Sequence, residues 1–236
     1  IVSVKTFEDQ ERVAALFKTY DLLSMPVVDI ENRLVGIITV DDIVDIIEQE
    51  NTEDFQKMAA MEPNEQPYLK TPVLTLAKNR IVWLLVLMIS ATVTGTIIQG
   101  FEDVLQSVVI LASFIPMLMD TGGNSGSQSS TLVIRGLALG EITTKDFLKV
   151  IFKEFRVSIV VATVLAIVNF LRLYLFTSAD LMISLTVCAS LFFTVILAKV
   201  IGGVLPIISK KLKLDPAIMA SPLITTIVDA FALIVY

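Results

Sequence analysis

Three oxygen-bearing side chains recur at four-residue intervals in the last apolar stretch, LDPAIMASPLITTIVD. They are Ser221, Thr225 and Asp229, and in a helix this spacing places them on one face. A carboxylate near the centre of a bilayer costs at least ~2.5 kcal/mol, so we expect Asp229 to face an aqueous cavity and to meet a cation. The alternative is a structural ion pair with Lys199, the only basic residue well inside an apolar segment.

Two further features of this stretch supply oxygen atoms. Asp215 stands before Pro216, which suits the first position of a helix, so Asp215 is either an ion ligand at the mouth of the helix or its cap. Pro222 lacks an N–H group and is predicted to free a backbone carbonyl for an ion or its water shell.

A second motif, PMLMDTGGNSGSQ at residues 116–128, places polar groups inside another apolar run. Asp120, Asn124 and Gln128 add a carboxylate and two amides, and three glycines permit close helix approach or non-helical backbone. Such a stretch is tolerated in lipid where it lines a water-filled path. The alternative is a glycine-rich packing kink.

The candidate ligands are all hard oxygen atoms, which favour Mg²⁺, Ca²⁺ or Mn²⁺ over softer metals. Few carboxylates lie in the apolar segments, which suits an ion that keeps much of its water, as Mg²⁺ does. The sequence contains no histidine, so histidine-based catalysis is excluded, and the single cysteine, Cys188, cannot form an internal disulfide.

A third set of acids lies near the N-terminus. Like charges three or four residues apart on a helix repel, and a divalent cation would relieve that repulsion. The alternative is a solvated acidic face. The set comprises Asp9, Glu11, Asp21, Asp41, Asp42, Asp45, Glu48, Glu50, Glu53 and Asp54.

Composition separates a soluble part from a membrane part. Of 236 residues, 55% are hydrophobic, and the net charge of −6 comes mainly from the first 80 or so residues. That acidic balance argues against nucleic acid as a partner and for cations. Five apolar segments follow, each long enough to span a bilayer: 81–98, 104–139 through the second motif, 157–176, 181–208 and 216–236.

The soluble part is predicted to form a small α/β unit. A strand at 2–4, a helix capped by Thr6, strands at 25–29 and 34–39 and a helix opening at Asp41 follow one another. Basic residues cluster before the first apolar segment, between the second and third, and between the fourth and fifth. The positive-inside rule then puts the N-terminal module in the cytoplasm and the C-terminus outside. Because the sequence opens on Ile1 in a strand, we expect it to be a fragment of a longer chain.

The motifs resemble a known family. PMLMDTGGNSGSQSSTLVIRGLALGE, together with LDPAIMASPLITTIVD, resembles the MgtE family of Mg²⁺ channels and transporters. LSMPVVDIENRLVGIITVDDIVDII is similar to the second half of a cystathionine-β-synthase-type (CBS) domain. The resemblance implies a homodimer with five spans per subunit and an ion path along its two-fold axis.

The resemblance also implies site residues. A hydrated Mg²⁺ would be held at Asp229, with backbone carbonyls near Thr225 and Ser221; members of the family often carry Asn where this chain has Ser221. Asp215 and Asn124 complete the predicted pore set. Thr39 and Asp42 match a nucleotide-contacting T-x-x-D pattern, which implies ATP at the CBS module. The implied regulatory Mg²⁺ sites comprise Asp9, Glu11, Asp21, Asp45, Glu50, Glu53 and Asp54.

The sequence therefore predicts a predominantly α-helical membrane protein with five transmembrane helices and a partial α/β CBS module. The predicted divisions are a CBS part at 1–50, a connecting helix and linker at 51–80, and an ion-conducting domain at 81–236. The predicted function is Mg²⁺ import across the plasma membrane, closed by cytosolic Mg²⁺. The alternative is a secondary transporter coupling a divalent cation to Na⁺ or H⁺. An ATP-driven pump is disfavoured because the sequence has no P-loop and no phosphorylatable DKTG-type motif. An intramembrane enzyme is disfavoured because Asp120 and Asp229 have no His or Lys partner evident from the sequence.

Overall fold

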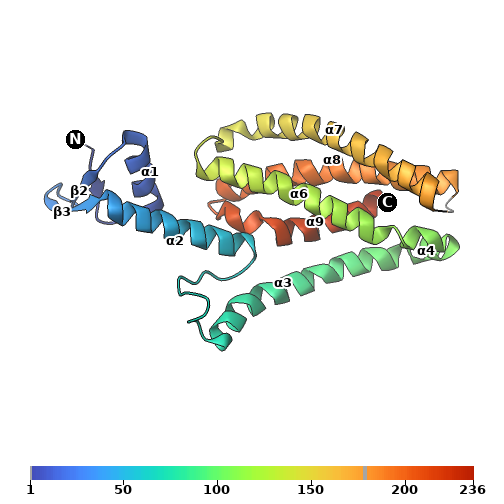
Figure 1. The fold of residues 1–236 in the computed structure, drawn as a ribbon, viewed down its shortest axis with the longest axis horizontal. Coiled ribbons are helices and arrows are strands. Elements are labelled where there is room, and N and C mark those ends of the chain that lie inside the picture. The colour runs from blue at the N-terminus through green and yellow to red at the C-terminus, as the bar shows by residue number, and fades with distance from the viewer. Residues whose placement is uncertain (1, 178–179) are drawn as a thin grey trace. The chain divides into compact units, whose positions relative to one another are not determined.

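The computed structural model describes residues 2–177 and 180–236, and for residues 104, 107 and 221 it describes the backbone alone. The chain divides into two compact units. The first comprises Ile1–Gln56 and Pro63–Thr71, and the second comprises Lys57–Glu62 and Pro72–Tyr236. Each unit is described by itself below, and Figure 1 labels the elements.

The first unit is a three-stranded sheet with two helices. The strands β1 (Val4–Lys5), β2 (Ser24–Val28) and β3 (Leu34–Thr39) lie in that order, with β1 parallel and β3 antiparallel to β2. The helices are α1 (Gln10–Tyr20) and α2 (Val40–Met58). Alternating apolar residues of the sheet and one face of each helix form the core, around Val4, Val13, Phe17, Met25 and Ile43.

The start of α1 differs from the prediction. Thr6 lies before a turn, and the helix is capped instead by Asp9, whose carboxylate accepts a hydrogen bond from the backbone N–H of Glu11 at 3.0 Å. Asp9 has the extended backbone of an N-cap residue, and its acidic side chain also suits the positive end of the helix. The prediction that Thr6 caps this helix was therefore wrong.

At the start of α2 the acid lies inside the helix and accepts hydrogen bonds from the residue before the helix. The carboxylate of Asp42 accepts hydrogen bonds from the backbone N–H of Thr39 at 3.2 Å and from its hydroxyl at 2.9 Å. From there α2 runs unbroken across residue 50, so the acids of its first half and those of its second half share one rigid element.

The second unit is helical. Its helices are α3 (Val73–Gly100), α4 (Glu102–Ser107), α5 (Val109–Ala112), α6 (Ile115–Ala138), α7 (Phe147–Phe176), α8 (Leu181–Lys211) and α9 (Ser221–Val235), with 3₁₀ turns η1 (Thr144–Asp146) and η2 (Pro216–Met219). α6 packs against both α8 and α9, α7 packs against α8, and α3 against α9 (Figure 1).

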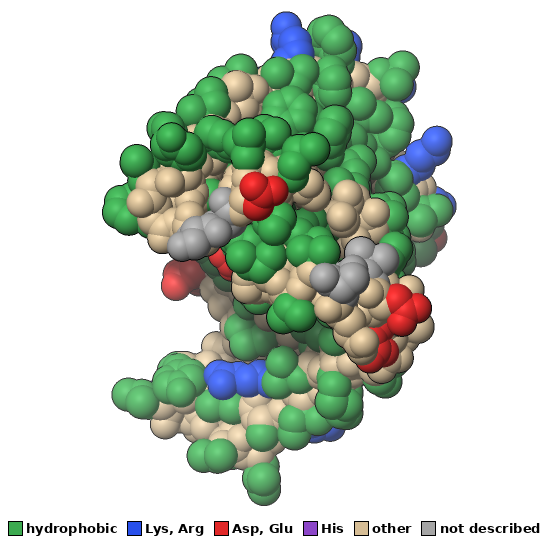
Figure 2. Space-filling view, turned by 90° about the vertical axis from the view of Figure 1, so that its right-hand side faces the viewer, with side chains coloured by type: hydrophobic (Ala, Val, Ile, Leu, Met, Phe, Trp, Pro, Cys, Tyr) green, Lys and Arg blue, Asp and Glu red, His purple; other side chains and the backbone are tan. Residues whose placement is uncertain are grey.

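Within the described residues, four helical stretches are long and apolar enough to cross a membrane. They are Val73–Gly100, Thr144–Phe176, Leu181–Lys211 and Pro216–Val235. Figure 2 views the molecule from the right-hand side of Figure 1, and hydrophobic side chains are widespread there, between polar side chains and a few acidic ones. The predicted second segment is not among the four, because α6 carries too many polar residues.

That second segment also differs in its bounds. The sequence predicts one span from residue 104 to 139, whereas the chain forms two short helices, α4 and α5, before α6 begins at Ile115. Pro116 stands in the first turn of α6. A proline fits there because the N–H groups of a first turn have no helical partner, and it disfavours helical backbone just before it.

The glycine-rich motif lies in an unbroken helix, so its glycines do not take the non-helical backbone that the sequence left open. Residues 116–128 lie wholly within α6, and their glycines serve close approach between helices. A methyl group on Gly122 would come within 2.8 Å of Thr194 on α8 and 2.9 Å of Val228 on α9. A methyl group on Gly202 of α8 would fall on the backbone carbonyl of Gly126. α6 therefore lies directly against both neighbours.

Candidate ion-binding site

The two polar motifs meet along α6 and α9, which run antiparallel. Near the start of α9, the hydroxyl of Ser130 donates to the carbonyl of Met219 at 2.6 Å. One level further, Gly123 faces Thr225, where an added methyl group would lie 2.8 Å from the threonine methyl. Beyond that level, the carboxylates of Asp120 and Asp229 are near enough to interact electrostatically.

The polar residues of α6 form one line. Asp120, Asn124 and Gln128 follow at four-residue spacing, so they share a face, and all three are exposed in the single chain. On α9, Thr225 and Asp229 are half-buried beside this face. The two predicted motifs are therefore brought together, as one polar strip on two neighbouring helices.

Asp229 is not neutralised by Lys199. Lys199 is only 5% exposed, and its ammonium lies 3.5 Å from the amide oxygen of Gln128. In the described part of the chain no ion pair engages Asp229 or Asp120. The structural pair that the sequence left open is absent from these residues.

Pro222 does not free a carbonyl in the way the sequence suggested. It stands in the first turn of α9, where its missing N–H group removes no intrahelical hydrogen bond. Its own carbonyl accepts hydrogen bonds from the hydroxyls of Thr225 at 2.9 Å and Thr226 at 3.0 Å. Ser221, the third predicted residue of this face, has a side chain that lies outside the described residues.

Asp215 caps the turn η2, and it also forms an ion pair with a lysine of the chain. One carboxylate oxygen accepts the backbone N–H of Ala217 at 2.9 Å, at the start of η2. The other accepts the ammonium of Lys57 at 2.7 Å, and the side chains of Lys57 and Asp215 are mostly buried, with 24% and 30% exposed. Both residues belong to the second unit. The sequence analysis missed Lys57, because 158 positions separate it from its partner and no local pattern links them.

In the first unit, four other predicted regulatory acids lie near Glu50. Burial, together with the charges of Glu53, Glu11, Asp9 and Asp54, raises the pKa of the Glu50 carboxyl above its ordinary value of 4.5. These five predicted regulatory acids are thus close enough to repel one another. Glu50, Glu53 and Asp54 are half-buried, whereas Asp9 and Glu11 are exposed.

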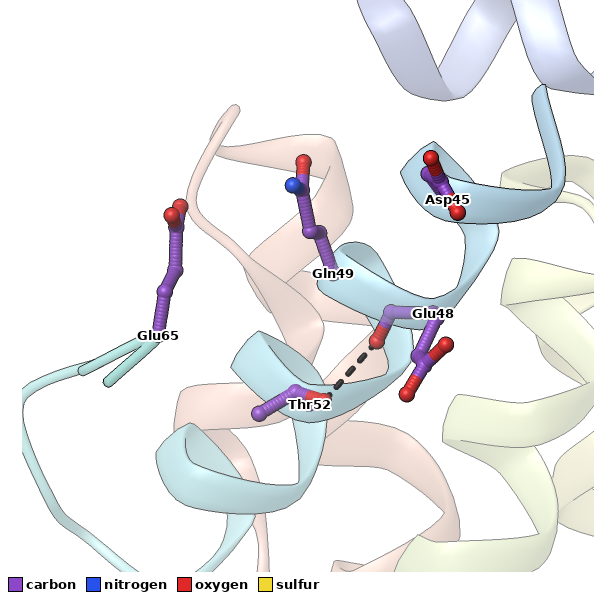
Figure 3. A pocket seen from close by; sticks show the side chains of 5 residues that line it. All are labelled: Asp45, Glu48, Gln49, Thr52 and Glu65. Carbon is purple, nitrogen blue, oxygen red and sulfur yellow. Dashed lines mark hydrogen bonds between the residues drawn. The ribbon is translucent and has the colours of Figure 1, made fainter. Parts of the chain in front are cut away.

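The other predicted regulatory acids lie elsewhere. Asp45 lines a separate pocket of about 220 Å³ with Glu48, Gln49, Thr52 and Glu65. Figure 3 shows the first four on successive turns of α2, with Glu65 on the segment that follows the helix. Asp21 ends α1 in left-handed backbone, with φ of 49°.

No described group of three or more carboxylates has the geometry of a metal site. The acids around Glu50 are near one another without forming a ligand cage. The predicted nucleotide residues Thr39 and Asp42 bond to each other at the start of α2.

These features define a class of protein: a multi-pass helical membrane protein with a small α/β module and a polar strip on two tightly packed helices. The MgtE family, described as "Divalent cation transporter", matches residues 115–236, and the CBS domain matches residues 1–49. Since the MgtE match covers more than half of the chain, the chain belongs to the MgtE family. The resemblance to both is thereby confirmed.

Curated relatives of the chain support its place in this family. The magnesium transporter MgtE of Bacillus subtilis is 40% identical over all 236 residues, and that of Thermus thermophilus is 39% identical over the same length. The magnesium transporter MgtE of Enterococcus faecalis is 30% identical. The chain spans 52%, 52% and 51% of these relatives, about half of their length.

Proposed function

We propose that this chain forms the membrane part and the adjoining regulatory module of a Mg²⁺ channel. The observation that carries the proposal is the pair Asp120 and Asp229, two carboxylates that approach each other on packed helices with no ion pair among the described residues. Two such groups at membrane depth are stable only where water and a cation reach them. The relatives that match the whole chain are named magnesium transporters, which supports the same ion and a role as a transporter rather than an enzyme.

The ion is a hydrated Mg²⁺. Around Asp120 and Asp229, the polar strip offers amide and hydroxyl oxygens from Asn124 and Thr225. Two carboxylates with neutral oxygens suit an ion that stays largely hydrated, since each neutral group can bind a coordinated water. Ser221 begins α9, Asp215 caps the preceding turn η2, and both complete the proposed path.

α6 is the fifth membrane span in this proposal. Because of its polar face, α6 is less apolar than an ordinary membrane span. It nevertheless packs against the apolar helices α8 and α9 and is 24 residues long, enough to cross a bilayer. Five spans place the N-terminal module in the cytoplasm and the C-terminus outside the plasma membrane, which agrees with the loop charges. The proposed divisions are residues 1–50, 51–80 and 81–236.

A homodimer completes the path. In the single chain, Asp120 and Asn124 are exposed on the polar face of α6. Lipid is a poor neighbour for these groups, whereas a second copy related by a two-fold axis would present the same polar face and enclose water between them.

Cytosolic Mg²⁺ closes the channel. Burial and, after it, repulsion from neighbouring acids raise the pKa of the Glu50 carboxyl, and ions bound among Asp9, Glu11, Glu50, Glu53 and Asp54 would relieve that repulsion. Asp45 and Asp21 complete the proposed regulatory set. A ligand that binds one of two states more tightly shifts the population toward it, and here the favoured state is the closed one. ATP bound at Thr39 and Asp42 remains a prediction of the CBS resemblance.

The function is tested with the full-length protein in liposomes that contain a fluorescent Mg²⁺ indicator. We expect Mg²⁺ uptake at low Mg²⁺ on the cytoplasmic side and strongly reduced uptake at high Mg²⁺. Uptake that is equal under both conditions would remove the gating proposal, and no uptake under either would remove the channel.

A further inference from the structure

One face of α7 carries two cations above an apolar groove. Lys153, Arg156, Val157, Val160 and Val161 line an open hollow of about 430 Å³. Their spacing of three and four residues places them along one side of the helix. Val157 and Val160 are 42% and 65% exposed, so the groove is open to the surroundings of the helix.

The two cations lack acidic partners. Among the described residues, no ion pair engages Lys153 or Arg156, whereas Lys149, one turn earlier, donates to Asp146 at 2.8 Å. The guanidinium of Arg156 instead lies 4.9 Å from the centre of the Phe152 ring. This contact with a ring face leaves the hydrogen-bond donors of the guanidinium available for an anion.

The position of the groove matches the edge of a bilayer. The cations lie in the second and third turns of α7, and the exposed valines follow toward the middle of the span. At 1.5 Å per residue, Lys153 and Val161 are separated by about 12 Å along the helix axis. This is the distance over which a phospholipid passes from its phosphate into its acyl chains.

We propose that this groove is a binding site for one anionic phospholipid, with its phosphate between Lys153 and Arg156 and its acyl chain along Val157, Val160 and Val161. The charges select an anionic headgroup, and the valines select a lipid over a soluble anion, which would gain nothing from an apolar wall. Basic residues at the edge of a span attract anionic lipid by about 1 kcal/mol each.

The opposite side of the same turn explains what the lipid would stabilise. Glu154 points the other way, where its carboxylate accepts a hydrogen bond from Ser129 of α6 at 2.6 Å and its side chain packs on Gly203 of α8. A lipid bound on one side of this turn would therefore stabilise the packing of α6, α7 and α8. The inference depends on the membrane location of α7 and not on the identity of the transported ion.

The test measures lipid binding and thermal stability of the full-length protein in detergent, with phosphatidylglycerol or phosphatidylcholine added. Wild-type protein is expected to bind phosphatidylglycerol and to melt at a higher temperature with it than with phosphatidylcholine. The double variant Lys153→Gln, Arg156→Gln should lose about tenfold or more in phosphatidylglycerol affinity. The control Lys145→Gln, Lys211→Gln removes the same charge from exposed positions in η1 and at the end of α8, outside the groove, and should bind as wild type.

Three results would overturn the proposal: equal responses to the two lipids, equal losses in both double variants, or a full stabilisation by inorganic phosphate alone. If the variant is less stable even without lipid, native mass spectrometry of the same samples measures bound phosphatidylglycerol directly. Retained phosphatidylglycerol on the Lys153→Gln, Arg156→Gln protein also contradicts the site.

Discussion

Asp120 and Asp229 lie on two helices, α6 and α9, that pack closely against each other. Asp120 lies near the glycines of α6, where α6 and α9 pack closely. At this place the two carboxylates are near enough to interact electrostatically. The types of these residues and their four-residue spacing were visible in the sequence. Their pairing was not, because it depends on the contact between Gly123 and Thr225, which no local pattern encodes.

Glu50 gives a prediction at the same scale. Its pKa is raised in the folded protein, so the folded state binds this proton more tightly than the unfolded state. The resulting stability is present below the ordinary value of 4.5 and is lost as pH rises through the raised pKa. At neutral pH, Glu50→Gln should therefore raise the melting temperature in Mg²⁺-free buffer, measured by differential scanning fluorimetry.

Mg²⁺ should reduce the difference in melting temperature between Glu50→Gln and wild type, because the ion stabilises the wild-type acids and leaves the glutamine unaffected. Glu48→Gln, on the side of α2 that faces the other pocket, is the matched control. A Glu50→Gln protein that melts as wild type without Mg²⁺, or that keeps the full response to Mg²⁺, would contradict the regulatory role of Glu50.

At the scale of elements, the contact between α6 and α8 fixes the polar strip. A methyl group on Gly202 would fall on the backbone of Gly126, which cannot move aside as a side chain can. Gly202→Ala should thus destabilise the protein by about 1–3 kcal/mol, as overpacking does elsewhere. Thermal unfolding in detergent measures this change.

Gly95→Ala on α3 provides the comparison. An added methyl group there meets nothing within 4 Å, so alanine should be neutral or stabilising by up to about 1 kcal/mol through its higher helix propensity. Equal stabilities of the two variants would show that α6 and α8 do not pack as closely as described.

The connection from α2 to α9 gives another prediction. Lys57 binds Asp215 at the start of η2, so the last turn of α2 is tied to the entry of α9. Lys57→Gln should raise the internal Mg²⁺ concentration needed for half-closure by up to about fivefold, given an ion pair worth up to about 1 kcal/mol. The measurement is liposome uptake against internal Mg²⁺.

Lys18→Gln, which removes an exposed cation from α1, controls for the change in net charge. If both variants respond alike, or if Asp215→Asn restores the sensitivity of Lys57→Gln, the tie between the two helices has no part in closure.

The elements also show what the sequence could predict. Alternating and helical patterns indicated both strands of the hairpin and both helices of the small unit, and the apolar runs indicated four membrane helices. The patterns failed where a terminus is set by a single hydrogen bond or ring, as at Asp9, Pro116 and Pro222. The sequence also predicted a span at 104–139, whereas α6, which lies in that range, is not among the four described stretches that are long and apolar enough to cross a membrane.

At the scale of the whole molecule, the driving force separates the two transport mechanisms. A channel responds to the Mg²⁺ gradient and the membrane potential, whereas a secondary transporter requires a gradient of Na⁺ or H⁺. We expect potential-driven Mg²⁺ uptake that does not change when Na⁺ and pH are equal on both sides. Uptake that stops under those conditions would favour the coupled mechanism.

The most direct test of the account is Mg²⁺ uptake by Asp229→Ala, reconstituted beside wild type and Asp103→Ala. Loss of one charged ligand, worth roughly 1.5–3 kcal/mol, predicts a decrease in uptake of about tenfold or more. Asp103 lies exposed on the short helix α4, so its variant should transport as wild type. Size-exclusion profiles establish that all three proteins are folded. Wild-type uptake by Asp229→Ala would contradict the claim that this carboxylate carries the ion.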